Sequence, residues 1–288
     1  MASDFSTIRF IRENIKKVLM EQYPEKEIDA ISDILFCHRL DLEKHEVGLN
    51  RDERLPPADQ QWFGQALRYL KDGYPVQYVT GQAEFCSLIL DVTPEVFIPR
   101  PETEELVHWI IEDLTNPAPV ILDIGTGSGC IALALKKYIP ASGMLATDVD
   151  GSALVVASKN AGNLELDIQF FLHDILTDKS PSGLPMSDII VSNPPYVPMS
   201  ERNAMPTQVK DHEPGAALFV ADDDPLLFYT SIAGFACKQL KEGGQLYLEI
   251  HEKFGMKVMD LLREKGFASL ELRQDINGKD RMIKALLP

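Results

Sequence analysis

Beyond Pro119 the chain alternates short apolar runs of strand length with longer segments of helical periodicity. Such alternation predicts an α/β fold with a doubly wound, mostly parallel sheet that has helices on both faces. In such sheets ligands bind beyond the carboxyl ends of the strands, where the strand order reverses. The expected strands are Val120–Ile124, Met144–Thr147, Ile168–Leu172, Asp188–Val191, Gln245–Ile250, Ala268–Leu272 and Met282–Leu286, and the expected helices between them are Cys130–Tyr138, Ser152–Asn160, Pro225–Leu240 (ending at Gly243-Gly244) and Lys253–Lys265.

The first eighty residues follow a different pattern. Apolar residues recur at helical spacing from Ile8 to Leu19 and again from Ile28 to Leu35, and a break at Pro56 precedes a third apolar face. From Pro75 to Ile98 the pattern becomes β-rich around Gly81, as in a hairpin that joins two domains. The expected domains are therefore a small helical domain (1–80), a β-hairpin linker (81–98) and the α/β domain (99–288).

The net charge of −16 is unevenly placed along the 288 residues. Residues 1–80 hold 11 Lys and Arg against 14 Asp and Glu, a net charge of −3, so residues 81–288 hold the other −13. A protein that grips phosphate backbones needs a basic face, and the composition provides none. We therefore expect no direct nucleic-acid binding, and we expect the acidic surface to attract a basic partner.

Cysteine usage and hydropathy bear on the compartment. The four cysteines are scattered without a C-x-x-C pair, which argues for reduced thiols and against a disulfide frame or a zinc site. The sequence has neither the apolar region of a signal peptide nor an uninterrupted run of about 18 apolar residues. We expect a cytoplasmic protein that does not bind membranes.

A glycine-rich loop follows the first strand of the α/β part. Gly125-Thr126-Gly127-Ser128-Gly129 lies between the strand ending at Ile124 and the helix beginning at Cys130. The spacing is G-x-G-x-G, whereas the dinucleotide fingerprint G-x-G-x-x-G would put its last glycine at Cys130, which argues against NAD. Glycines allow the backbone to turn sharply and a ligand to lie against it.

Two acidic residues follow the next two strands. Asp148 ends the second strand, where a carboxylate can accept both hydroxyls of a ribose in charge-assisted hydrogen bonds. Asp174 follows the third strand, and its side chain and the backbone N–H of Ile175 can meet an adenine edge. These positions predict a nucleoside-containing ligand.

Asn193-Pro194-Pro195-Tyr196 follows the fourth strand. The prolines stiffen the backbone, so the Asn193 side-chain oxygen and the Pro194 carbonyl can face one point, with the Tyr196 ring as a wall. Each of these acceptors can take one proton of a planar NH₂ group. Together with the glycine loop, Asp148 and Asp174, in that order, this motif resembles the class I S-adenosylmethionine methyltransferases, whose fold is a Rossmann-like seven-stranded sheet.

Within that class, Asn-Pro-Pro-Tyr is typical of enzymes that methylate nitrogen in planar systems: adenine N6, guanine N2 or a glutamine amide. The nitrogen lone pair is delocalised, so it attacks poorly until acceptors hold its protons and change its geometry. The remaining requirement is in-line positioning of nitrogen, methyl and sulfur. This chemistry requires no metal.

The rest of the chain resembles the release factor glutamine methyltransferase family (HemK/PrmC). The resemblance rests on the helical N-terminal part, Pro75–Gly81 with Phe85, Phe97–Glu104 (Phe-Ile-Pro-Arg-Pro-Glu-Thr-Glu), the loops above, Glu213–Leu218 and Leu248–His251. It covers essentially the whole chain, and Ile98–Glu104 is its most family-specific part. It implies N5-methylation of the glutamine in the Gly-Gly-Gln loop of class I peptide chain release factors, with S-adenosylmethionine as methyl donor and S-adenosylhomocysteine as product.

The resemblance also implies residue roles. The proline-arginine segment is expected near the cofactor and substrate entrance, and the helical domain is expected to help hold the protein substrate. We expect a monomer. The expected catalytic residues are Asn193, Pro194 and Tyr196; the cofactor-binding residues are Gly125, Thr126, Gly127, Gly129, Asp148, Asp174, Ile175 and Asn193; the substrate-binding residues are Asn193, Pro194, Pro195, Tyr196, Arg100, Pro101, Glu102 and Thr103; metal ligands, none.

The sequence departs from the family at two places. The family has Glu-His-Gly after the fifth strand, whereas here Ile250 separates Glu249 from His251, and the segment Asn277–Arg281 keeps only the Asp-Arg step of the family's C-terminal pattern. Two alternatives stay open. One is a nucleic-acid methyltransferase acting on adenine N6 or guanine N2, and the other is a non-catalytic, S-adenosylmethionine-binding factor associated with the ribosome.

Overall fold

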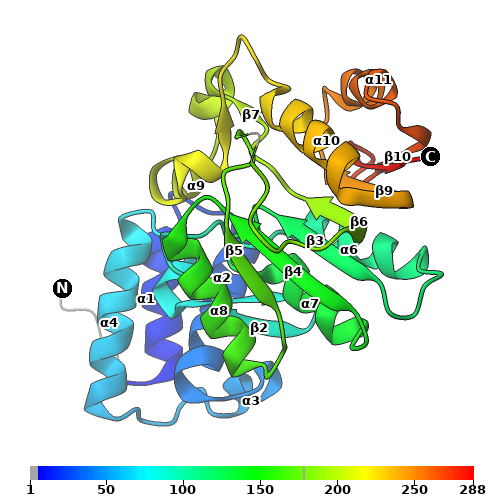
Figure 1. The fold of residues 1–288 in the computed structure, drawn as a ribbon. Coiled ribbons are helices and arrows are strands. Elements are labelled where there is room, and N and C mark those ends of the chain that lie inside the picture. Colours follow the sequence, from blue (N-terminus) through cyan, green and yellow to red (C-terminus); the bar gives the residue numbers. More distant parts are fainter. Residues whose placement is uncertain (1–5, 178) are drawn as a thin grey trace. The chain divides into compact units, whose positions relative to one another are not determined.

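The computed structural model describes residues 6–177 and 179–288 and divides the chain into two compact units (Figure 1). One unit comprises the chain up to Gln82 together with Pro206–His212, and the other comprises Ala83–Met205 and Glu213–Pro288. Among the described residues, no helix has the length and apolarity that crossing a bilayer requires.

The first unit is helical, which confirms the helical pattern expected for the N-terminal part. Thr7 caps its first helix by accepting a hydrogen bond from the N–H of Phe10, and Ile11, Leu19 and Phe36 are fully buried in its core. No pattern in the sequence indicates that a later segment, Pro206–His212, belongs to this unit. The helices of this unit are α1 (Ile8–Leu19), α2 (Glu25–Leu40), α3 (Lys44–Leu49), α4 (Pro57–Lys71), α5 (Val76–Thr80) and α9 (Thr207–His212).

The expected hairpin is shorter than predicted. Residues 76–80 form helix α5 rather than a strand, because Pro75 has a backbone conformation suited to a helix start and Gly81 ends the helix at a φ of 72°. The hairpin consists of β1 (Gln82–Phe85) and β2 (Leu88–Asp91), joined by two residues at positive φ.

The second unit contains a seven-stranded sheet in the order β10-β11-β9-β6-β3-β4-β5, which confirms the predicted methyltransferase fold. β11 runs antiparallel to both of its neighbours, and the other pairs are parallel. The strands are β3 (Val120–Ile124), β4 (Gly143–Asp148), β5 (Gln169–Leu172), β6 (Ser187–Ser192), β9 (Leu240–Glu249), β10 (Ala268–Gln274) and β11 (Asp280–Leu286).

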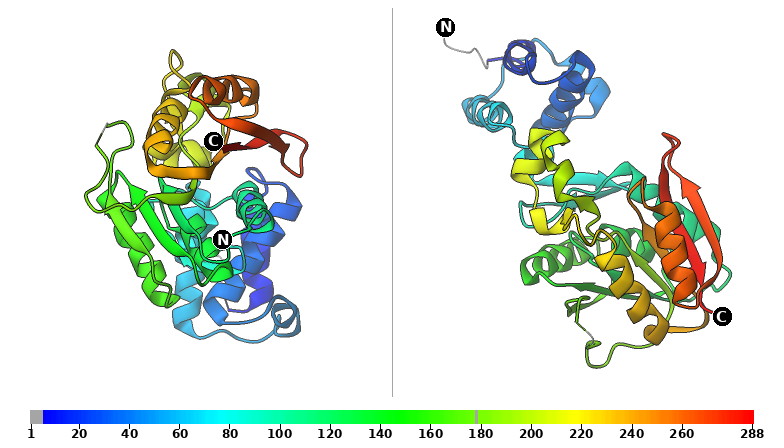
Figure 2. Two further views of the ribbon diagram at one scale, coloured as in Figure 1. Left: turned by 45° about the vertical axis from the view of Figure 1, so that its right-hand side comes forward. Right: turned by 90° about the horizontal axis from the view of Figure 1, so that it is seen from above.

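Helices cover both faces of this sheet (Figures 1 and 2). Alternate residues of β3 point to opposite faces, so Ile121 packs in one apolar cluster and Leu122 in the other. The first cluster includes residues of the hairpin, and the second includes Tyr229 and Leu262. One face is covered by α6 (Pro101–Glu112), α7 (Cys130–Tyr138) and α8 (Gly151–Asn163), and the other by α10 (Leu227–Gln239) and α11 (Gly255–Glu264).

Gly243 and Gly244 were expected to end a helix, and this was wrong. α10 ends at Gln239 and β9 follows at once, with an irregular register against β6 between Ser187 and Ile189. Gly243 has a φ of 73°, and a Cβ on Gly244 would lie 2.8 Å from a backbone oxygen. These glycines therefore accommodate a bulge inside a strand.

Candidate active site

The strand order reverses at β3, which lies between β4 and β6. Ile124, the last residue of β3, pairs with Thr147 of β4 and with Ser192 of β6, and Ser192 in turn pairs with Leu248 of β9. The Ser192 hydroxyl also donates a hydrogen bond of 2.7 Å to the Ile124 carbonyl. The segments that follow these four strands therefore meet at one edge of the sheet, where α/β proteins bind ligands.

The glycine loop lies at this edge. The N–H groups of Gly125 and Thr126 both donate to the Thr147 carbonyl, at 2.8 and 2.9 Å, so the end of β4 holds the loop. Gly129 begins α7 at a φ of 86°, and a Cβ there would lie only 3.0 Å from Leu133 and 3.2 Å from Ala157. A side chain at 129 would therefore be strained, both by the positive φ and by these close contacts.

Asp148 stands beside this loop. One oxygen of its carboxylate accepts the N–H of Gly127 at 2.8 Å, and the other accepts the N–H of Asp150 at 3.0 Å. Burial raises the pKa of Asp148, and the two backbone donors oppose this shift. Each carboxylate oxygen has a second lone pair, so the group can still accept ribose hydroxyls.

Asp123 is a further acidic residue of the site that the sequence reading missed. It is fully buried in β3, where one oxygen accepts the Thr126 hydroxyl at 2.6 Å, and the other has no partner among the described residues. Burial raises the pKa of Asp123 to about 7. A buried carboxylate oxygen without a protein partner suits a cationic ligand group, and S-adenosylmethionine has an ammonium and a sulfonium. The sequence feature that could have identified Asp123 is a carboxylate inside an otherwise apolar strand.

Asp174 and Ile175 come next along the same edge. The N–H of His173 donates to the Asp148 carbonyl at 2.8 Å, which holds this segment next to Asp148. The Asp174 side chain accepts the N–H of Leu176 at 2.9 Å and so shapes the turn. Contact of Asp174 and Ile175 with an adenine stays a prediction.

A chain of hydrogen bonds joins the Asn-Pro-Pro-Tyr segment to two other elements. The Asn193 side-chain NH₂ donates to the Thr103 hydroxyl at 3.1 Å, and this hydroxyl donates to Glu249 at 2.6 Å. The Tyr196 hydroxyl donates to the other oxygen of Glu249 at 2.9 Å. Pro194 is buried, whereas Asn193 and Tyr196 are half-buried. The structure therefore connects Tyr196 directly, and Asn193 through Thr103, to Glu249, which was not predicted.

The proline-arginine segment is held by an acidic residue from a distant loop. Arg100 forms an ion pair with Glu213, whose side chain is only 1% exposed and also accepts the N–H of Ile98 at 3.2 Å. The Arg100 guanidinium lies 4.6 Å from the centre of the Phe97 ring. Arg100 thus fixes the course of this segment.

Helix α6 begins at Pro101, and no side chain caps it. Glu102 lies in the first turn of this helix, where a negative charge is favourable. Thr103 is 2% exposed and its hydroxyl is taken up by Asn193 and Glu249. Pro101 is exposed and Glu102 is half-buried at the start of the helix.

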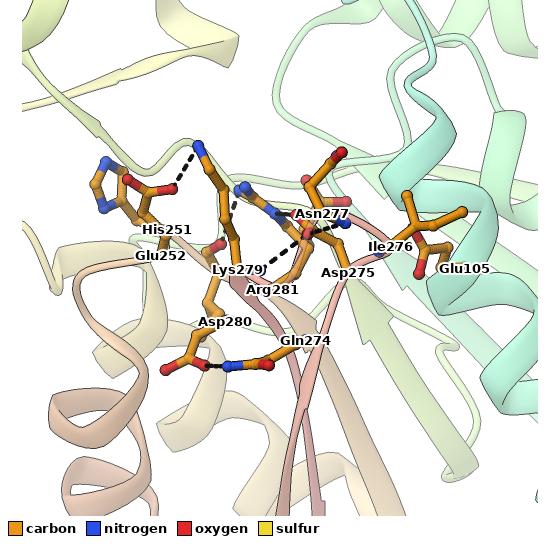
Figure 3. A network of polar contacts seen from close by, with 12 residues as sticks. Glu105, His251, Glu252, Gln274, Asp275, Ile276, Asn277, Lys279, Asp280 and Arg281 are labelled. Atoms are coloured by element: carbon orange, nitrogen blue, oxygen red, sulfur yellow. Dashed lines mark hydrogen bonds and ion pairs between the residues drawn. The ribbon is translucent and has the colours of Figure 1, made fainter.

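The turn between β10 and β11 supports the residue after Glu249 (Figure 3). Arg281 donates to the buried Asp275 at 3.1 Å and to the Ile250 carbonyl at 3.3 Å. Next to them Lys279 pairs with Glu252 at 2.8 Å. Arg281, the second residue of the Asp-Arg step, therefore anchors the end of β9.

The expectation that no metal is needed stays a prediction. Potential ligand atoms of Cys86, Glu104 and His108 lie within 4.8 Å of one another. Glu104 already accepts the N–H of Cys86 at 2.9 Å, and burial raises the pKa of the Cys86 thiol to about 12. Cys86 lies in the hairpin turn, and Glu104 and His108 lie on α6.

Comparison with known proteins decides the family. The "PrmC N-terminal domain" model matches residues 11–81 and the "Methyltransferase small domain" model matches residues 103–209. The chain is 39% identical to the release factor glutamine methyltransferase of Bacteroides thetaiotaomicron, over 94% of this chain and 97% of that protein. It is 40% identical to that of Flavobacterium psychrophilum, over 96% and 98%. The chain belongs to the release factor glutamine methyltransferase family.

As a release factor glutamine methyltransferase, the chain is an S-adenosylmethionine-dependent enzyme, and solved structures agree on its fold. The 16S rRNA N2 G1207 methyltransferase of T. thermophilus matches with a TM-score of 0.53 at 19% identity, over 72% of this chain and 50% of that chain. A methyltransferase from Pyrococcus furiosus matches with a TM-score of 0.51 at 16% identity, over 69% and 88%. At such identities the likeness shows the fold alone.

Proposed function

We propose that this enzyme methylates the side-chain amide nitrogen of the glutamine in the Gly-Gly-Gln loop of class I peptide chain release factors. The observation that supports this most is the Asn193 side chain, whose NH₂ group is engaged by Thr103. Its Oδ1 is the other branch of the same planar amide and so points away from Thr103. An acceptor is thereby available at the edge of the sheet beside the glycine loop.

Two acceptors activate the substrate nitrogen. The Asn193 Oδ1 and the Pro194 carbonyl each accept one N–H of the glutamine NH₂, which draws the nitrogen out of conjugation with its carbonyl. The new N–C bond forms as the S–C bond breaks, the electron pair of the broken bond stays on sulfur, and the nitrogen loses one proton to solvent. Because the rate depends mainly on how the reacting atoms are oriented, rigid prolines beside the acceptors favour the reaction.

Tyr196 acts as a wall and not as a base. Burial, and after it the negative charge of Glu249, raises the pKa of Tyr196 well above its ordinary value. Its hydroxyl is already donated to Glu249. The ring therefore stays neutral and is free to pack against the planar amide.

S-adenosylmethionine, when bound, supplies the electrophilic methyl group and leaves as S-adenosylhomocysteine. Asp148 accepts the ribose hydroxyls of the cofactor. The carboxylate of Asp123, which is held by Thr126, favours the cationic part of the cofactor. The glycine loop lies against the cofactor. Asp174 and Ile175 read the adenine edge.

Protein recognition involves two further features. The net charge of −13 on residues 81–288 favours a basic partner and disfavours a nucleic acid. The helical unit helps to hold the release factor, and Pro101 and Glu102 line the entrance beside the ion pair of Arg100.

Transfer of labelled methyl from S-adenosylmethionine tests the substrate. The acceptors to compare are a purified class I release factor, its variant with Ala in place of the Gly-Gly-Gln glutamine, DNA and rRNA. We expect label on the unmodified factor only. Label on nucleic acid would identify the base-methylating alternative, and cofactor binding without any transfer would identify a binding factor.

A further inference from the structure

We infer that Glu249 and Thr103 are positioning residues that fix which end of the Asn193 amide faces the substrate. This inference rests on the proposed function, because it concerns the acceptor that holds the glutamine nitrogen. Neither residue needs to touch the substrate. Thr103 is 2% exposed and Glu249 is 1% exposed.

The direction of each hydrogen bond follows from Glu249. Burial raises the pKa of Glu249, and the hydrogen bonds from Thr103 and Tyr196 and the charge of Arg281 oppose this shift. In its ionised form the carboxylate can only accept, so the Thr103 hydroxyl at 2.6 Å donates its single proton to it. The Thr103 oxygen then has only lone pairs left for Asn193, at 3.1 Å. The NH₂ end of Asn193 must face Thr103, and the oxygen end must face away.

The alternative orientation is costly in this site. If the Asn193 amide were flipped, two oxygens would face each other across 3.1 Å without a proton between them. The substrate would then meet an NH₂ donor where it needs an acceptor for its own N–H. The buried carboxylate thus sets the polarity of a side chain with which it has no hydrogen bond.

Glu249 positions the other end of the motif at the same time. Its second oxygen accepts the Tyr196 hydroxyl at 2.9 Å, so one carboxylate holds both Asn193, through Thr103, and Tyr196. The carboxylate is itself held from outside the motif. Its strand position pairs with Met282 of β11, and Arg281 binds the carbonyl of the next residue, Ile250.

Matched substitutions at Thr103 test this inference in the full-length enzyme. Thr103→Val removes the hydroxyl at nearly constant volume, and Thr103→Ser keeps it. We expect Thr103→Val to lower kcat roughly tenfold or more, with little change in KM for the release factor or in the Kd of S-adenosylmethionine. Thr103→Ser should stay within about threefold of the wild type. If Thr103→Val does not fold, Thr103→Ala serves in its place.

A double-mutant cycle separates positioning from general support. If Thr103 acts through Asn193, Thr103→Val has no further effect on kcat in an Asn193→Ala background. The same fold-loss in both backgrounds would overturn the inference. Glu249→Gln is a third test of the inference. The NH₂ group of the introduced glutamine can donate to Thr103, which allows the flipped orientation of the Asn193 amide. A reduced kcat is therefore expected.

A readout without substrate keeps this test apart from that of the proposed function. In NMR spectra of the ¹⁵N-labelled enzyme, the Asn193 NH₂ signals are identified by their loss in Asn193→Ala. We expect them to be protected from solvent exchange in the wild type and in Thr103→Ser, but not in Thr103→Val. Equal protection in all three would overturn the inference, whereas failure of the wild type to methylate any release factor would overturn only the proposed function.

Discussion

The carboxylate of Asp148 accepts the backbone N–H of Gly127 at 2.8 Å, so the end of β4 and the middle of the glycine loop are directly joined. The same residue is the proposed acceptor for the ribose of the cofactor. One side chain therefore shapes the loop and binds the ligand that lies on it. Removing the Asp148 side chain is therefore expected to weaken cofactor binding, because the loop loses a contact that shapes it and the ribose loses its acceptor.

Asp148→Ala is expected to raise the Kd of S-adenosylmethionine by about tenfold to a hundredfold, since charge-assisted hydrogen bonds contribute roughly 1.5 to 3 kcal/mol. Isothermal titration calorimetry measures this change. Asp167→Ala, which removes the same charge from an exposed position, should leave the Kd unchanged. Equal affinity of Asp148→Ala and the wild type would contradict the ribose assignment.

Asn193→Ala removes an acceptor that acts mainly in the transition state. We expect kcat to fall about a hundredfold, which corresponds to about 3 kcal/mol, with cofactor affinity nearly intact. Steady-state kinetics with a release factor gives kcat, and calorimetry gives the affinity. Asn163→Ala, on the exposed side of α8, is the control. Normal turnover of Asn193→Ala would refute the acceptor role.

Asp123 makes stability depend on pH in a defined window. Burial raises its pKa to about 7, with a further contribution from Asp148 that the Thr126 hydrogen bond opposes. In the unfolded chain it titrates near 4, so the stabilising contribution of the protonated form is full below about pH 4 and is lost as pH rises to about 7. Asp123→Asn has no such titration.

The free energy of unfolding of Asp123→Asn, minus that of the wild type, should therefore increase from about pH 4 to about pH 7 and then level off. The increase is expected to be on the order of 1 to 4 kcal/mol. Urea unfolding of the ligand-free proteins at several pH values measures it, and titrating groups that do not interact with Asp123 cancel in the difference. A difference that stays constant across this range would show that the pKa of Asp123 is ordinary.

The ion pair between Arg100 and Glu213 stabilises the proline-arginine segment. Arg100→Gln leaves a carboxylate that is 1% exposed without its cation, and we expect the free energy of unfolding to fall by about 2 to 3 kcal/mol. Adding Glu213→Gln removes the unpaired charge and should restore most of that loss. Urea unfolding of the wild type, Arg100→Gln and the double variant measures these free energies. If Arg100→Gln alone were as stable as the wild type, the ion pair would contribute nothing to stability.

The fold could be predicted because each strand of the large sheet is an apolar run that ends at a turn or a glycine loop. The periodicity of apolar residues indicates which side of each segment is buried, and the assignment of strands and helices along the chain depends on this local burial. Residues 76–80 were misjudged because a five-residue segment rich in β-branched residues has no clear period, and the flanking Pro75 and Gly81 decided its conformation.

The candidate site could be predicted only where its residues lie in contiguous motifs. The hydrogen bond between Asn193 and Thr103 joins residues 90 positions apart, and that between Thr103 and Glu249 joins residues 146 positions apart. No local pattern contains such pairs. Likewise, α9 belongs to the helical unit although it follows the Asn-Pro-Pro-Tyr segment, because its packing partners are far away in the sequence.

Tandem mass spectrometry tests most directly which atom of the release factor receives the methyl group. A purified class I release factor is incubated with the enzyme and S-adenosylmethionine, and the peptide containing Gly-Gly-Gln is fragmented. We predict that the peptide gains the mass of one CH₂ and that the fragments place it on the glutamine side chain. A peptide of unchanged mass, or a methyl group on another residue, would contradict the proposed function.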